Sequence, residues 1–189
     1  MKILIAGGGI GGLTTALSLH AAGQTDLQVF EAAAEIRQLG VGVNLPPHAV
    51  RELTELGLGD ELARIGIPTS ELAYYDRRGK LIWAETRGLA AGYRWPQYSI
   101  HRGRLQQVLY EALTQRLGDA SVKTSRRVTG FEQDVVQPNG GRNEVRNDVR
   151  DGLPAGVRAR VSDRDGHSQV HQGDLLVACL LYTSPSPRD

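Results

Sequence analysis

Residues 2–12 read Lys-Ile-Leu-Ile-Ala-Gly-Gly-Gly-Ile-Gly-Gly, and this stretch decides the fold. Its apolar first half predicts a buried strand, and the residues from Leu13 to Ala22 predict the helix that follows. A second apolar run, Leu27–Phe30, ends on Glu31. The order of strand, glycine turn, helix, strand and acid predicts an α/β fold that begins with a βαβ unit.

The glycines of this turn fit the pattern G-x-G-x-x-G, in which each glycine has a mechanical task. Gly7 allows the tight turn, Gly9 lets a pyrophosphate approach the backbone, and Gly12 lets the helix pack closely on the sheet. The helix N-terminus then offers free N–H groups to the phosphates. The predicted contacts are Gly7, Gly8, Gly9, Ile10, Gly11, Gly12, Glu31 and Ala32.

Glu31 follows the last glycine of the motif by about 20 residues, the spacing at which an acid accepts hydrogen bonds from a ribose. A carboxylate there favours a free 2′-hydroxyl, hence FAD or NAD rather than NADP. These residues leave the choice between FAD and NAD open. They also allow a plain βαβ unit in which Glu31 is a solvated strand end.

The composition restricts the class of protein. A net charge of +1 gives no indication of nucleic-acid or membrane-surface binding, and no apolar run reaches the length of a membrane span. We therefore expect a cytoplasmic protein with one domain. His167 and His171 are four residues apart on a turn and a strand, and no carboxylate or cysteine cluster accompanies them, so no metal site is predicted.

Further elements follow from local patterns. Gly40 and Gly42 bracket an extended stretch that leaves room for a ligand or another strand. The other predicted helices run from Pro47 to Leu56, over 60–65 and over 103–117. The predicted strands form a hairpin over 71–85, a short strand over 122–124, an antiparallel pair of 128–132 with 156–162, and a buried strand over 173–178. An exposed loop is predicted over 137–154.

Arg102 and Arg104 lie at the start of the helix predicted over 103–117, where cations are unfavourable by about 0.3–1 kcal/mol each. An anionic partner would offset this cost, and a dinucleotide pyrophosphate is a suitable one. The alternative is that both arginines are simply solvated.

Together with the glycine motif and Glu31, residues 39–46 (Leu-Gly-Val-Gly-Val-Asn-Leu-Pro) and Leu56-Gly57-Leu58 resemble the class A flavoprotein aromatic hydroxylases, such as the p-hydroxybenzoate and salicylate hydroxylases. The resemblance implies a Rossmann-like FAD-binding domain with a central parallel sheet. It also implies flavin contacts at Val43 and Asn44, FAD contacts at Arg102 and Gln106, and a backbone contact to adenine near Val128.

Within that family, residues 39–44, 67–72, 87–92 and 96–103 resemble the phenazine-modifying flavin monooxygenases. This implies hydroxylation of a small aromatic or phenazine-like substrate with NAD(P)H and O₂ through a flavin C4a-hydroperoxide. The resemblance assigns 1–70 and 99–178 to a discontinuous FAD-binding domain and 71–98 to the start of a substrate-facing sheet. No residue here is predicted to act as an acid or base.

Two other functions fit the residues. An NAD-binding dehydrogenase would make residues 40–44 and Arg102 incidental, and a non-catalytic module would bind FAD or adenine nucleotide without turnover. Residues 179–189 (Cys-Leu-Leu-Tyr-Thr-Ser-Pro-Ser-Pro-Arg-Asp) can be encoded by a transposon-end adapter used in sequencing libraries. We expect them to be read-through of that adapter and the chain to be a C-terminally truncated member of the family.

Overall fold

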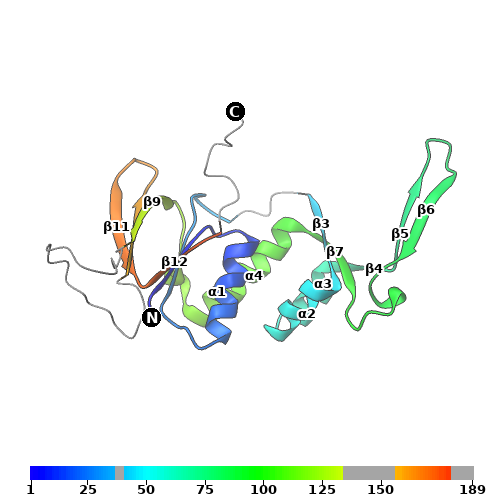
Figure 1. Cartoon of the computed structure of the whole chain (residues 1–189), viewed down its shortest axis with the longest axis horizontal. Coiled ribbons are helices and arrows are strands. Elements are labelled where there is room, and N and C mark those ends of the chain that lie inside the picture. Colours follow the sequence, from blue (N-terminus) through cyan, green and yellow to red (C-terminus); the bar gives the residue numbers. More distant parts are fainter. Residues whose placement is uncertain (37–40, 134–155, 180–189) are drawn as a thin grey trace, which may run out of the picture. The chain divides into compact units, whose positions relative to one another are not determined.

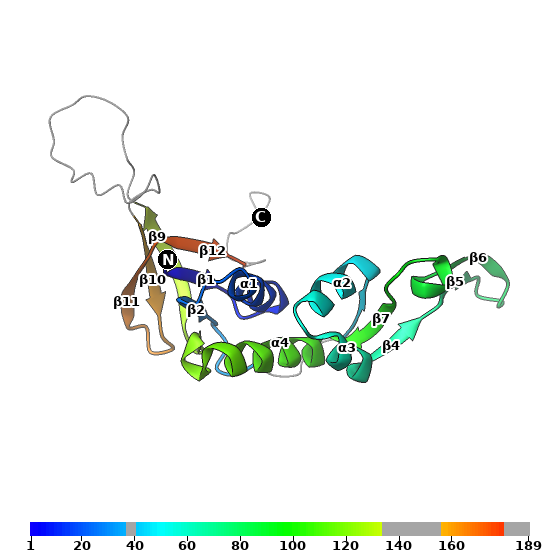
Figure 2. The same cartoon turned by 90° about the horizontal axis from the view of Figure 1, so that it is seen from below.

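The computed structural model describes residues 1–36, 41–133 and 156–179, and the chain forms two compact units. The first unit consists of Met1–Ile36 and Tyr110–Asp189, and the second of Arg37–Leu109. Helix α4 (Arg102–Leu117) contributes its first half to the second unit and the rest to the first. The elements are labelled in Figures 1 and 2, and each unit is described by itself.

The first unit is built on a parallel sheet with the strand order β12-β1-β2-β8. Its strands are β1 (Ile3–Ala6), β2 (Leu27–Phe30), β8 (Val122–Lys123) and β12 (Leu175–Ala178). Helix α1 (Ile10–Ala21) connects β1 to β2 and contacts both strands. This is the predicted βαβ unit, and the predicted α/β class with a parallel sheet is confirmed.

The central strand β1 is buried on both faces, which explains its continuous apolar run. A second, antiparallel sheet packs against Leu4 and Phe30 through Ala159 and Val161. Its strands are β9 (Arg127–Gln133), β10 (Val157–Ser162) and β11 (Ser168–Gly173), in the order β11-β10-β9. In Figure 2 this sheet lies beside β1 and β12.

Most of the elements predicted for this unit are confirmed, but the strand predicted to be buried over 173–178 spans only Leu175–Ala178 and is partly exposed at the edge of the sheet, with Leu175 42% exposed. Residues 128–132 pair with 156–162 as antiparallel β9 and β10, and β12 pairs in parallel with β1. The first helix begins at Ile10 rather than Leu13, because its first turn is made by the glycine motif itself. The loop predicted over 137–154 lies outside the described residues.

The second unit holds a sheet with the order β3-β7-β4, in which both pairs are antiparallel. Its elements are β3 (Gly42–Leu45), α2 (Pro47–Glu55), α3 (Gly59–Ile65), β4 (Gly66–Thr69), β5 (Glu71–Tyr75), β6 (Leu81–Thr86), a 3₁₀ turn η1 (Gly88–Ala91) and β7 (Gln97–His101). Both helices and the hairpin were predicted. Strands β4 and β7 were not, and Pro68 is tolerated because β4 lies at the sheet edge.

The β5–β6 hairpin exposes large apolar side chains. Tyr74, Ile82 and Trp83 are 54%, 68% and 45% exposed, and the Tyr74 and Trp83 rings lie 5.8 Å apart. Asp76 closes the turn by accepting backbone hydrogen bonds from Arg78 and Lys80. The predicted role of 71–98 as part of a substrate-facing sheet stays a prediction. Among the helices of the described ranges, none is long and apolar enough to cross a membrane.

Candidate functional site

The turn after β1 has the geometry that its glycines predict. Gly7 is buried with a φ of +107°, a conformation that favours glycine, and its N–H donates to the Phe30 carbonyl at 2.8 Å. Gly12 lies against the same turn, since a Cβ at this position would stand 1.8 Å from the Gly7 carbonyl oxygen. The start of α1 can therefore approach the end of β1 only without a side chain at Gly12.

Gly9 differs from both, because a Cβ at this position would meet nothing within 4 Å. It is the N-cap of α1, and no side chain caps this helix end. No acidic residue occupies the first turn either, so no side chain of this turn offsets the positive end of the helix dipole. This combination suits a phosphate group, and the residues present fit a dinucleotide.

Glu31 lies at the carboxyl end of β2 and its side chain folds back over the glycine turn. One carboxylate oxygen accepts a hydrogen bond from the Gly8 N–H at 2.7 Å, and the other accepts from the Ala33 N–H at 2.7 Å. The half-buried Ala32 lies between these contacts. Sequence reasoning assigned Glu31 a ribose contact and missed this bracing role, for which the motif gives no signal.

We expect Glu31→Ala to lower the free energy of unfolding by about 1–3 kcal/mol even without cofactor, because two backbone N–H groups lose a charged acceptor. It should also weaken FAD binding about tenfold through lost ribose hydrogen bonds. Thermal unfolding and FAD titration measure the two effects separately. Glu31→Gln should fall in between, because an amide offers only one acceptor oxygen. If the glutamine variant equals the wild type in both assays, the conclusion that both carboxylate oxygens of Glu31 accept stabilising hydrogen bonds is wrong.

Val128 lies on β9 and is half-buried, and its side chain packs against the cluster of Leu4, Phe30, Ala159 and Val161. The contact that the resemblance implies is made by the backbone, so this packing is compatible with it. The adenine contact itself stays a prediction.

The remaining predicted residues belong to the second unit, where strand pairing brings them together. Gly42 of β3 lies opposite His101 of β7, and Asn44 lies opposite Ser99. The Ser99 hydroxyl donates to the Asn44 amide oxygen at 2.7 Å, and the Arg102 N–H donates to the Val41 carbonyl at 3.1 Å. Val43 and Asn44 are thus held beside the strand that leads directly into α4.

Arg102 and Arg104 are exposed at the start of α4, and neither forms an ion pair within the described ranges. Gln106 is half-buried one turn later. Next to Arg102, the Nδ1 atom of His101 is buried and has no hydrogen-bond partner in the part of the chain that the structure describes. Ser99 and His101 were not predicted as site residues. The alternation of polar and apolar residues along 97–101 is the signal that could have indicated them.

His167 and His171, near the C-terminal end of the chain, both lie among residues that stabilise the fold. Asp163, Asp165 and His167 each place one ligand atom within 4.8 Å of the others, but Asp163 accepts backbone hydrogen bonds from the other two and so forms the β10–β11 turn. The His171 ring meets the Phe30 ring edge-on at 4.8 Å. Burial, followed by the charges of Lys123, Lys2 and Arg126, lowers the pKa of His171.

Comparison with known families gives one match over nearly the whole chain. The profile of the FAD binding domain family matches residues 1–179. A phenazine 1,6-dicarboxylic acid hydroxylase of Lysobacter antibioticus is 55% identical over 130 residues, which are 69% of this chain and 32% of that protein. A salicylate hydroxylase of Pseudomonas putida is 31% identical over 90% of this chain and 40% of its own length.

Solved structures show the same fold. The p-nitrophenol 4-monooxygenase of Pseudomonas putida DLL-E4 superposes with a TM-score of 0.74 over 94% of this chain and 40% of that one, at 21% identity. A variant of Klebsiella pneumoniae HpxO, solved with FAD, gives 0.62 over 93% of this chain and 38% of its own, at 30% identity. The chain therefore spans less than half the length of these relatives.

Proposed function

Because the chain belongs to the FAD binding domain family, among the class A aromatic monooxygenases, we propose that it is the cofactor-binding part of an FAD-dependent monooxygenase that hydroxylates an aromatic, phenazine-like substrate. NAD(P)H and O₂ are the proposed co-substrates. The observation that carries the proposal is the open space at Gly9 beneath the uncapped N-terminus of α1.

In this proposal the N–H groups of residues 9–12 bind the FAD pyrophosphate, and Glu31 accepts hydrogen bonds from the ribose. Val43, Asn44, Arg102, Gln106 and the backbone at Val128 are proposed as further FAD contacts, with the resemblance as their support. Bound FAD would supply the redox and oxygen chemistry, and the chain's own residues hold and orient it.

The substrate class rests on the relatives. The relative at 55% identity is named for a phenazine dicarboxylic acid, and another is named for salicylate. Both names describe aromatic carboxylates. In the whole protein, NAD(P)H oxidation should therefore be faster with phenazine-1,6-dicarboxylate than with salicylate. Stimulation by salicylate alone would contradict the phenazine part of the proposal and leave the FAD part intact.

The cofactor proposal is tested on the chain itself, by titrating FAD, NADH and ADP in turn into the purified protein. Saturable FAD binding that is tighter than NADH binding supports a flavoprotein. Binding of NADH without FAD would instead support the dehydrogenase alternative, in which Arg102 has no role.

Replacing Arg102 tests whether its side chain contacts FAD or is simply solvated. Without cofactor, Arg102→Ala should raise stability by about 0.3–1 kcal/mol, because a cation leaves the positive end of α4. With FAD, it should weaken binding about tenfold through the lost charge-assisted hydrogen bond. Thermal unfolding with and without FAD measures both effects, the gain in stability and the loss of FAD binding. Arg104→Ala is the matched control, and an equal loss of FAD affinity in both variants would exclude a specific role for Arg102.

A further inference from the structure

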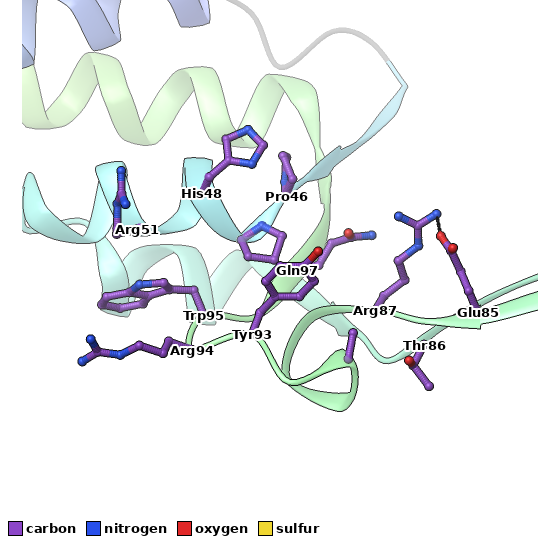
Figure 3. A pocket seen from close by; sticks show the side chains of 12 residues that line it. Pro46, His48, Arg51, Glu85, Thr86, Arg87, Tyr93, Arg94, Trp95 and Gln97 are labelled. Carbon is purple, nitrogen blue, oxygen red and sulfur yellow. Dashed lines mark ion pairs between the residues drawn. The ribbon is translucent and has the colours of Figure 1, made fainter.

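Ser125 has an unusual backbone conformation for a serine. Its φ is +53°, and in the described part of the chain no other residue apart from glycines has a positive φ. Other turns use glycine for this conformation. Gly88 and Gly92, for example, begin and end η1, the turn that leads into Tyr93 in Figure 3. A side chain in this region is unfavourable and persists only where the surrounding contacts hold it.

The contacts of this segment begin where the parallel pairing of β2 with β8 becomes irregular. The Glu31 N–H donates to the Lys123 carbonyl at 2.8 Å, and the Glu31 carbonyl accepts from the Arg126 N–H at 2.8 Å. In a regular parallel ladder the two partners of one residue lie two positions apart, but here they lie three apart. One extra residue therefore lies opposite Glu31, as in a β-bulge, and the left-handed conformation of Ser125 accommodates it.

The extra residue gives the Ser125 N–H a different acceptor, the Ala33 carbonyl at 2.8 Å. The Ala33 N–H in turn donates to one carboxylate oxygen of Glu31, and the Gly8 N–H donates to the other, both at 2.7 Å. The Glu31 side chain lies against the glycine turn, since a Cβ at Gly8 would stand 3.0 Å from the Glu31 Cβ. A continuous series of hydrogen bonds thus connects Ser125 through Ala33 to the Glu31 carboxylate.

This series leaves the carboxylate able to bind a ligand. A carboxylate has about four lone-pair directions, and the two N–H groups use only part of them. Because backbone groups already fix its orientation, little freedom is lost when it accepts further hydrogen bonds. From these contacts we propose that Ser125 is a positioning residue, whose left-handed turn holds Ala33 and thereby fixes the Glu31 carboxylate for the ribose of FAD. The inference rests on the proposed function, in which Glu31 contacts that ribose.

The first test replaces Ser125 by residues that differ in their tolerance of this backbone. Valine is β-branched and strongly disfavours a positive φ, whereas asparagine has a similar size and tolerates it. Without FAD, the NMR signals of the Gly8 and Ala33 amides should move in Ser125→Val in the same direction as in Glu31→Ala. Ser125→Asn should leave both signals close to the wild type. If both signals stay in place in Ser125→Val, the turn does not hold Glu31 and the proposal is wrong.

Two further variants separate the backbone conformation from other effects of the replacement. Ser162→Val places the same side chain at another half-buried serine, on β10, where a strand suits valine, and it should move neither signal. Ser125→Thr keeps the hydroxyl but is β-branched, so it should act like Ser125→Val and takes its place if the valine variant does not fold. A threonine variant equal to the wild type would assign the role to the hydroxyl and overturn the proposal.

The second test asks whether Ser125 affects FAD through Glu31. Ser125→Val should weaken FAD binding by about three- to tenfold, approaching the loss expected for Glu31→Ala itself. Added to Glu31→Ala, it should weaken binding by less than about twofold further, because the contact that it supports is already lost. An equal loss in both backgrounds would show that Ser125 acts independently of Glu31 and would refute the proposal. A wild-type chain that binds no FAD would instead contradict the proposed function, and the amide signals would still decide whether Ser125 holds Glu31.

Discussion

Gly12→Ala is expected to destabilise the first unit by about 3 kcal/mol, at the upper end of what added core atoms usually cost. The new Cβ would stand 1.8 Å from the Gly7 carbonyl oxygen, and a backbone atom cannot move aside as a flexible side chain can. Helix α1 must then move away from β1, which opens the core around Leu13 and Leu17. Thermal unfolding followed by circular dichroism should show a melting temperature lower by roughly 10 °C.

The neighbouring Gly11 provides the control. It lies in the same helical turn, but a Cβ there meets nothing within 4 Å. Alanine favours the helix over glycine by about 1 kcal/mol, so Gly11→Ala should leave the melting temperature unchanged or slightly higher. If both variants unfold like the wild type, the close packing of α1 on the Gly7 turn is wrong.

Gly9→Val should abolish FAD retention and leave the fold intact. Gly9 has an extended backbone, with φ −74° and ψ −179°, which valine adopts readily, and the space around it is empty. The added side chain fills the region through which a pyrophosphate reaches the N–H groups of α1. Loss of about two charge-assisted hydrogen bonds corresponds to a weakening of about a hundredfold or more. Flavin absorbance of the purified protein and FAD titration measure this loss.

Gly130→Val is its matched control, because a Cβ at Gly130 would also meet nothing within 4 Å and this residue lies on β9, outside the glycine turn. It should retain FAD like the wild type. Retention by the Gly9 variant as well would refute the pyrophosphate position, whereas a lower melting temperature for Gly9→Val alone would assign the residue a structural role instead.

The first unit was predictable because its signals are local. A strand, a glycine turn and a helix follow each other within residues 3–21, and the rule that relates them depends on backbone sterics alone. Gly7 and Gly12 have the constraints that the motif predicts. The structure does not test which residues contact FAD, so those assignments stay predictions.

The remaining features depend on contacts between segments that are distant in sequence. Ser99 holds Asn44 across 55 residues, and Glu31 accepts a hydrogen bond from the Gly8 N–H across 23 residues. Gln97 reads as an ordinary polar residue in the sequence, and it is buried only because β4 and η1 lie against the start of β7. No periodicity within one segment carries this information.

The strand order also has a consequence for synthesis on the ribosome. One edge of β1 pairs with β2, which is translated soon after it, but the other edge pairs with β12, and Lys2 contacts Asp174 across 172 residues. At about 5–20 residues per second, that edge waits roughly 10–30 s for its partner strand. During this interval the nascent chain displays an apolar strand edge, which makes it a natural client for chaperones.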